Sequence, residues 1–310
     1  MNAGAGGPRR APTRVGRTMP RAPAGPDEDT ASPVPGADVP ALQIQELILT
    51  LVGEYVADGA PIWSGGLVRL LEELGFSAAA SRIALGRVVS RGLLERARDG
   101  RRVYYRATDR LTEVLTEGHR QTFWFRYPAE EWDGRWTLDW YAIPEEHLIA
   151  RRRLSRRLGF LGFGALQDGT WIAPRDREAE VHALARRLDI EPYMVVFVGA
   201  PPGWVECPQL LARGWDLDDL EQRYAAFVAE FGQLRRKGVR SKLTPRAAFV
   251  ARTRVLEAFR QLAPLDPKLG EEFLRRQWRR QEAIDCFNEV EAALRPAAAE
   301  YFDALTDPDR

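Results

Sequence analysis

Residues 76–108 read FSAAASRIALGRVVSRGLLERARDGRRVYYRAT, and this stretch has clear local signals for secondary structure. It predicts a helix over residues 78–91 followed by a tight β-hairpin. Ser77 is a typical N-cap for such a helix, and Gly92 is a typical residue to end it. Asp99-Gly100 joins two runs that favour strands, and this dipeptide is among the strongest short signals for a hairpin turn.

The charge of this stretch is one-sided. Eight arginines and only two carboxylates, Glu95 and Asp99, leave residues 76–108 with a net charge of +6, whereas the whole chain of 310 residues carries +1. A local positive field on a nearly neutral chain is typical of a surface that meets nucleic acid.

A helical wheel divides the helix into two faces. The face expected to pack on the rest of the fold holds Ser81, Ala84, Leu85 and Val88. The opposite face holds Ala79, Ile83, Gly86 and Ser90, with Arg82 and Arg87 at its borders. Because this second face is small, the helix can approach a DNA major groove closely, where Ile83 can contact thymine methyl groups.

We therefore expect this helix and hairpin to bind double-stranded DNA. The residues expected to contact it are Ser77, Ala79, Arg82, Ile83, Gly86, Arg87, Ser90, Arg96, Arg98, Arg101 and Arg102. Contacts to phosphate would make the affinity fall with salt. The alternative is a protein-interaction module with a solvated arginine face.

Upstream, apolar residues at helical spacing predict helices within residues 41–59 and 63–75. Only Gly75 to Ser77 then separate the second and third helices, which is the short turn of a helix-turn-helix. With the hairpin, residues 41–118 predict a winged helix-turn-helix domain. Residues 1–40 are rich in Pro, Gly and Arg and are predicted to be a disordered tail.

The rest of the chain predicts two further domains, so the expected class is α+β. Residues 119–203 show the order β-α-β-β-α-β, which predicts a ferredoxin-like domain whose last strand, in PYMVVFVGA, is buried. Residues 204–310 predict a helical domain in which Pro296 breaks or kinks the last helix.

No set of residues predicts catalysis or a metal site. The two cysteines and three histidines are scattered without metal-ligand spacing. Asp139 is a candidate for nuclease chemistry, but that chemistry usually needs several carboxylates, so we expect it to be a hydrogen-bonding residue on a strand face. No apolar run approaches the ~20 residues that span a bilayer. We expect a cytoplasmic protein that is not an enzyme and has no resident cofactor.

Several segments, in order along the chain, resemble the PaaX-type repressors of phenylacetic acid degradation. The first segment is residues 75–108, with Gly75, Ser77, Arg82, Arg87, Gly92 and Gly100-Arg101. The others are Trp132-x-Gly134-x-Trp136, the Gly-Phe-Gly of residues 162–164, the Trp-Ile-x-Pro of residues 171–174, and two segments of the C-terminal helices. The resemblance covers residues 41–305.

The resemblance implies a homodimeric bacterial repressor that binds an inverted-repeat operator and is released by an acyl-CoA effector, with phenylacetyl-CoA the best-known example. It also implies a central domain similar to small CRISPR-associated nucleases, so a nucleic-acid-processing enzyme is the other alternative. For the effector we expect contacts from Arg151 and Arg152, which suit phosphate, and from Trp136 and Trp140, which suit an aromatic acyl group. A solvated basic helix and core tryptophans are the alternative interpretation.

Overall fold

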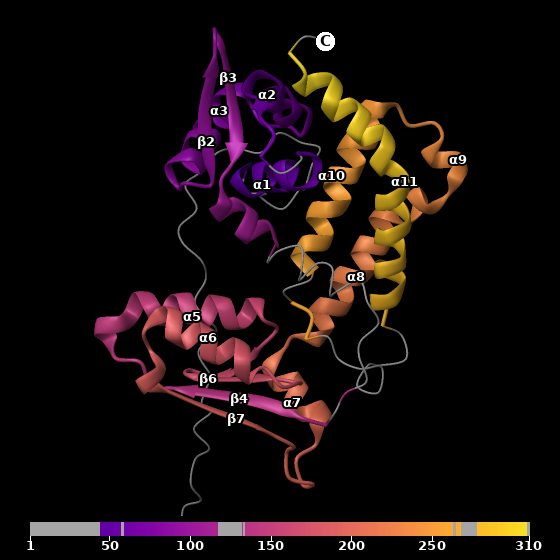
Figure 1. Ribbon diagram of the computed structural model, residues 1–310. Coiled ribbons are helices and arrows are strands. Elements are labelled where there is room, and N and C mark those ends of the chain that lie inside the picture. Colours follow the sequence, from indigo (N-terminus) through magenta and orange to yellow (C-terminus); the bar gives the residue numbers. More distant parts are fainter. Residues whose placement is uncertain are drawn as a thin grey trace, which may run out of the picture. The chain divides into compact units, whose positions relative to one another are not determined.

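The computed structural model describes residues 44–56, 59–116, 132, 134–262, 265–267 and 278–308. The predicted disordered tail, residues 1–40, lies outside the described residues. In the described part, helices are combined with two antiparallel sheets (Figure 1), so the predicted α+β class is confirmed.

The N-terminal region begins with helices α1 (Ile44–Tyr55), α2 (Ser64–Glu73) and α3 (Ala78–Ser90), followed by strands β2 (Leu94–Asp99) and β3 (Arg102–Ala107). Its apolar core is formed by the predicted faces of all three helices, with Leu51, Leu70 and Leu85 almost completely buried. A short strand, β1 (Ile62–Trp63), pairs with β3 and completes the sheet in the order β1-β3-β2. The sequence did not predict β1 because two residues are too few to show an alternating pattern.

The hairpin turn is shifted by one residue from its predicted position. Asp99 pairs with Arg102, so the connecting residues are Gly100 and Arg101 rather than Asp99 and Gly100. Gly100 has a φ of +56°, in the region that glycine adopts without strain. Glycine at the first connecting position is what a type II′ turn requires, so the register follows Gly100 and leaves Asp99 in the strand.

The central region has the strand and helix order that the sequence predicts. Its elements are β4 (Trp136–Tyr141), η1 (Glu145–His147), α5 (Leu148–Phe160), β5 (Gly164–Gln167), β6 (Thr170–Ala173), α6 (Glu178–Leu188), η2 (Glu191–Tyr193) and β7 (Met194–Gly199). The strands are antiparallel in the order β5-β6-β4-β7. Helices α5 and α6 cover one face of this sheet (Figure 1), where Leu154, Leu158 and Val181 are buried.

The expectation that the last strand of this sheet is buried is wrong. β7 is an edge strand, and alternate residues along it are exposed, with Val195 at 39% and Phe197 at 63%. Helix α7 (Cys207–Gly214), which the sequence did not predict, packs its Leu211 against Trp136 and Ile172 on the face away from α5 and α6. The apolar run of β7 resembles a buried strand, but its outer side chains remain open to solvent.

The C-terminal helices are α8 (Leu217–Phe231), η3 (Gly232–Arg235), α9 (Lys237–Arg240), α10 (Pro245–Leu262) and α11 (Arg280–Thr306). Phe259 of α10 stacks on Phe287 of α11 with ring centroids 3.9 Å apart. Of the break or kink expected at Pro296, the break is wrong, because α11 remains helical through this residue. Buried Leu294 and Ala298 on either side of the proline keep the helix packed in the core.

Helices α10 and α11 also contact the N-terminal region through a buried arginine. Arg252 of α10 is 1% exposed, and its Nη2 donates to Glu54 of α1 and to Glu291 of α11, each at 2.7 Å. The guanidinium carbon lies 4.7 Å from the ring centroid of Tyr55. Gly66 of α2 contacts the end of α11 so closely that a Cβ atom would lie 2.2 Å from the carbonyl oxygen of Leu305.

Candidate nucleic-acid interface

Helix α3 is oriented as its wheel predicts. Ser81, Ala84, Leu85 and Val88 are its buried residues. The backbone N–H of Ala80 donates to Ser77 Oγ at 3.2 Å, so Ser77 caps the helix. A hydroxyl that accepts one hydrogen bond still has a proton to donate, so this cap leaves Ser77 able to contact a phosphate.

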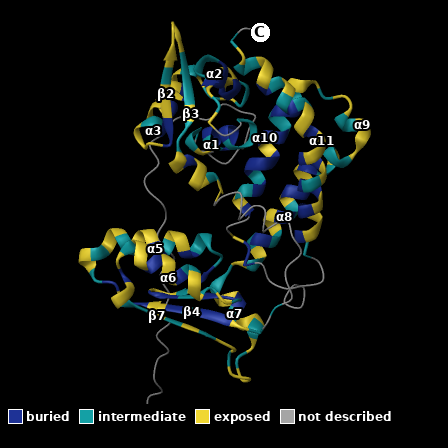
Figure 2. Cartoon of the chain, in the orientation of Figure 1, coloured by how far each residue is buried: buried dark blue, intermediate teal, exposed yellow. Residues whose placement is uncertain are grey.

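The opposite face of α3 is open to solvent (Figure 2), and it carries the residues predicted to read DNA: Ala79, Ile83, Gly86 and Ser90. Ile83 is 59% exposed, in the middle of this face. An added Cβ at Gly86 would meet nothing within 4 Å, so the face has no overhanging neighbour there. Ser90 Oγ donates to the Arg87 carbonyl at 2.9 Å.

Five arginines close to this face are exposed and form no ion pair with any described residue: Arg82, Arg87, Arg96, Arg98 and Arg101. Other arginines of the chain, such as Arg235 and Arg223, are paired with carboxylates. Guanidinium groups without a carboxylate partner keep all of their N–H donors available for phosphate.

The hairpin presents its arginines on two different faces. Side chains alternate along a strand, so Arg96 and Arg98 share a face with Leu94. Leu94 is buried in the core that also contains Val88 of α3. Arg96 and Arg98 therefore extend the side of the hairpin that faces α3.

Arg102 and Arg106 lie on the other face of the hairpin, directly across from Asp99 and Glu95 respectively. Arg102 also donates from Nη2 to the Pro308 carbonyl at 3.2 Å. The predicted arginines are thus all exposed on α3 and the hairpin, and Arg102 differs in that it also contacts the C-terminal segment.

A positioning residue that the sequence did not single out is Thr108, which joins the hairpin to α3. Its Oγ1 donates to the carbonyls of Gly92 at 2.8 Å and Leu93 at 3.1 Å, and it accepts from the N–H of Leu111 at 3.3 Å. A threonine between a strand and a helical segment is the available signal, since it suits an N-cap.

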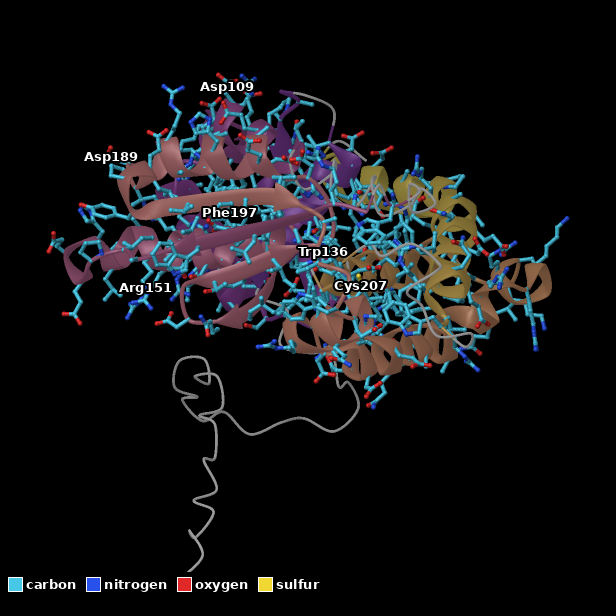
Figure 3. The ribbon with its side chains drawn as sticks, turned by 90° about the horizontal axis from the view of Figure 1, so that it is seen from below. Asp109, Trp136, Arg151, Asp189, Phe197 and Cys207 are labelled. Carbon is cyan, nitrogen blue, oxygen red and sulfur yellow. The ribbon has the colours of Figure 1, made fainter. Side chains whose placement is uncertain are left out.

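The four residues expected to bind an effector are not brought together. Arg151 and Arg152 belong to α5, and Arg151 Nη2 donates to Asp168 at 2.5 and 2.6 Å. Trp136 and Trp140 project from β4 on the opposite face of the sheet, where Trp136 is buried and Trp140 is 48% exposed. Figure 3 shows Arg151 well apart from Trp136. These four residues therefore do not line one pocket.

Asp139 is not the hydrogen-bonding residue that the sequence predicts. It is 0% exposed on β4, and neither carboxylate oxygen has a hydrogen-bond partner among the described residues. Burial raises the pKa of this carboxyl to about 7. A carboxyl without solvent access is badly placed to hold a metal ion against a nucleic acid.

Within the described ranges, the chain offers neither a metal site nor a membrane span. No cluster of three or more His, Cys, Asp or Glu side chains is arranged to hold a metal ion. No described helix has the length and apolar character needed to cross a membrane.

Comparison with known proteins assigns a family description to most of the chain. The description "PaaX-like protein" matches residues 43–111, "PaaX protein central Cas2-like domain" matches residues 129–211, and "PaaX-like protein C-terminal domain" matches residues 215–304.

The match with this chain covers most of the length of two similar proteins. The transcriptional repressor PaaX from Escherichia coli strain K12 is 28% identical over 261 residues, which are 82% of this chain and 81% of the relative. The solved structure of the uncharacterized protein Rv0674 from Mycobacterium tuberculosis has a TM-score of 0.50 and 21% identity, and the match covers 84% of this chain and 96% of that one. The second likeness concerns the fold alone.

Proposed function

Because this chain belongs to the family of PaaX-like proteins, we propose that it is a transcriptional repressor that binds DNA through α3 and the β2–β3 hairpin. It acts as a regulator and not as an enzyme. The curated relative is itself a transcriptional repressor, which supports this class of function.

The observation that carries the proposal is the exposed face of α3. Ile83 is 59% exposed at the centre of a face of small residues, and Arg82 and Arg87 border it without carboxylate partners among the described residues. A solvated helix surface does not need an exposed isoleucine, whereas a helix in a major groove uses apolar side chains against thymine methyls and arginines against guanine or phosphate.

The N-terminal region then works as a winged helix-turn-helix, and the central region as a ferredoxin-like body. The antiparallel strand order β5-β6-β4-β7, with α5 and α6 on one face, supports the second assignment. Two copies form a homodimer that places two α3 helices in successive major grooves. An inverted repeat with half-sites about one helical turn apart, ~34–36 Å, or a multiple of it, is the matching operator.

The repressed genes belong to an aromatic-acid catabolic operon of the phenylacetate type, and an acyl-CoA releases the protein from DNA. The family resemblance supports this part of the proposal. An effector that binds the DNA-free state more tightly than the DNA-bound state shifts the population toward release.

No specific observation favours either alternative, the nucleic-acid-processing enzyme or the protein-interaction module. A nuclease would need Asp139 to reach its substrate, and this carboxyl is fully buried. A protein-interaction module would not need arginines without partners on both α3 and the hairpin.

The test is a gel shift with the full chain and the DNA upstream of its own gene, in the presence of a scrambled competitor. We expect a specific complex that an inverted-repeat fragment reproduces and that phenylacetyl-CoA dissociates. Equal competition by scrambled DNA would contradict the repressor proposal. Persistence of the complex with every acyl-CoA tried would contradict the effector and leave DNA binding intact.

A further inference from the structure

A groove lies where the end of α2 meets α8, η3 and α10. It has a volume of about 470 Å³, within the ~300–1,000 Å³ typical of small-molecule sites. Its apolar part is formed by Phe231, Leu234, Val250 and Ala251. Phe231 is almost completely buried, so its ring forms part of the wall rather than of the rim.

Two arginines of α10 supply positive charge to this groove. Arg254 is exposed and has no ion-pair partner among the described residues. Arg246 donates from Nε to the Glu73 carboxylate, and this pair is partly open to solvent. Glu230 is the other carboxylate that lines the groove, and it forms no ion pair with a described residue.

Glu73 connects the groove to the DNA-binding surface. It is the last residue of α2, and only residues 74–77 separate it from the start of α3. Its carboxylate accepts from Arg246 of α10 and also from the Tyr301 hydroxyl of α11 at 3.1 Å. Both C-terminal helices therefore bond the end of α2 through this carboxylate, in addition to the apolar core that α2 shares with Phe249 and Phe302.

We propose that this groove is the effector site and takes an organic anion with an apolar body. The apolar body lies against Phe231 and Val250, and the anionic group binds Arg254 and competes with Glu73 for Arg246. Loss of the Arg246–Glu73 pair releases the end of α2 from α10, and with it the fixed position of α3. This inference rests on the proposed function, because it names the ligand site of a ligand-responsive repressor.

The mechanism satisfies the energetic requirement for a ligand-driven switch, which is a different interaction free energy in the two states. An anion in the groove forms a complete ion pair with Arg246 only after the Arg246–Glu73 pair has broken. The ligand therefore binds more tightly to the state in which α2 is released, and DNA bound by α3 weakens the ligand by the same factor.

The first experiment measures ligand binding by calorimetry on the full chain without DNA. The probes are phenylacetyl-CoA, phenylacetate and coenzyme A, which separate a carboxylate, a phosphate and an apolar acyl group as the source of recognition. The variants are Arg254→Ala and Ala251→Leu, the second of which fills the apolar part. Matched controls are Arg213→Ala and Ala179→Leu, at exposed helical positions outside the groove.

We expect at least one probe with an acyl or aryl group to bind the wild type, and both groove variants to weaken it at least tenfold while both controls leave it unchanged. Equal binding in all five proteins overturns the proposal, and so does the absence of binding of every probe to the wild type. Arg254 is exposed, so its replacement keeps the test valid even where Ala251→Leu does not fold.

The second experiment breaks the Arg246–Glu73 pair without a ligand. Glu73→Gln removes the charge but keeps an acceptor for the Tyr301 hydroxyl, and we expect it to weaken DNA binding about three- to tenfold in the absence of effector. Unchanged DNA affinity in Glu73→Gln overturns the coupling. If the wild type binds a probe but no DNA, the proposed function is contradicted and the groove is not. If it binds DNA but no probe, only the groove is contradicted.

Discussion

At the scale of single residues, Asp139 shows how little the identity of a side chain says about its surroundings. Thr137, Asp139 and Tyr141 alternate along β4 onto the face that α5 and α6 cover. The Thr137 hydroxyl donates to the Arg175 carbonyl at 2.7 Å and accepts from the Arg177 N–H at 2.8 Å. Asp139 has no comparable partner among the described residues, so burial alone governs its protonation and raises its pKa to about 7.

This pKa predicts a specific dependence of stability on pH. The carboxyl stays protonated in the folded chain up to about pH 7, whereas the unfolded chain releases the proton near its usual value of 3.8. The contribution of Asp139 is therefore fully present below about pH 4 and is lost as pH rises to about 7, by about 1.4 kcal/mol per unit.

Asp139→Asn removes this dependence, because an amide does not titrate. Urea denaturation of both proteins at several pH values from 5 to 8 measures it. We expect the free energy of unfolding of the wild type to fall relative to that of Asp139→Asn between pH 5 and 7 and to level off above. Parallel curves throughout would show that Asp139 has a partner that keeps its pKa near the usual value.

At the scale of the elements, the hairpin separates arginines that the sequence groups together. Arg96 and Arg98 share a face with Leu94, toward α3, whereas Arg102 and Arg106 lie across from Asp99 and Glu95. Opposite charges facing each other across an antiparallel pair attract, which reduces what Arg102 and Arg106 can offer to DNA.

Two double variants with the same loss of charge test this division. Arg96→Ala with Arg98→Ala is expected to weaken DNA binding about tenfold, and Arg102→Ala with Arg106→Ala about threefold or less, in fluorescence anisotropy at equal salt. An equal loss of DNA affinity in both variants would mean that binding depends only on the net charge of the hairpin and not on which face carries it.

The elements that the sequence predicts well are those with complete local signals. Helix α3 has its cap at Ser77, its packed face and a glycine after its end, so its range and orientation are confirmed. Helix α7 and strand β1 are short, and β7 has an apolar pattern that does not reveal its open side. The positions of these elements depend on contacts between residues distant in the chain. The same is true of Arg151 and Trp136, which lie on opposite faces of one sheet.

At the scale of the whole molecule, a buried ionic cluster connects α1 with α10 and α11. Arg252 contacts Glu54, Glu291 and the ring of Tyr55, and Glu291 also accepts from Arg295 at 2.9 Å. The burial of Arg252 depends on contacts between helices distant in the chain, which local periodicity does not show.

Removing the central cation of this cluster is expected to be costly, because Arg252 bonds both the buried Glu291 and the half-buried Glu54. Arg252→Ala should lower the free energy of unfolding by about 3 kcal/mol or more, as for other buried pairs that lose one member. The matched control is Arg223→Ala, which breaks the exposed Arg223–Asp219 pair on α8 and should cost under about 1 kcal/mol. Similar losses in denaturant melts of both variants would contradict a structural role for the cluster.

Whether α3 meets DNA is tested by the salt dependence of DNA affinity when this helix loses Arg82 and Arg87. Anisotropy titrations on the upstream fragment, from ~50 to ~250 mM salt, give log Kd against log salt for the wild type and for Arg82→Ala with Arg87→Ala. The control is Arg186→Ala with Arg187→Ala on α6, which removes the same charge from another exposed helix.

We predict that the α3 variant binds at least tenfold more weakly than the wild type, with a salt slope lower by about 1 to 2. The α6 control should match the wild type in both respects. Wild-type affinity and slope in the α3 variant would contradict the claim that this helix meets DNA.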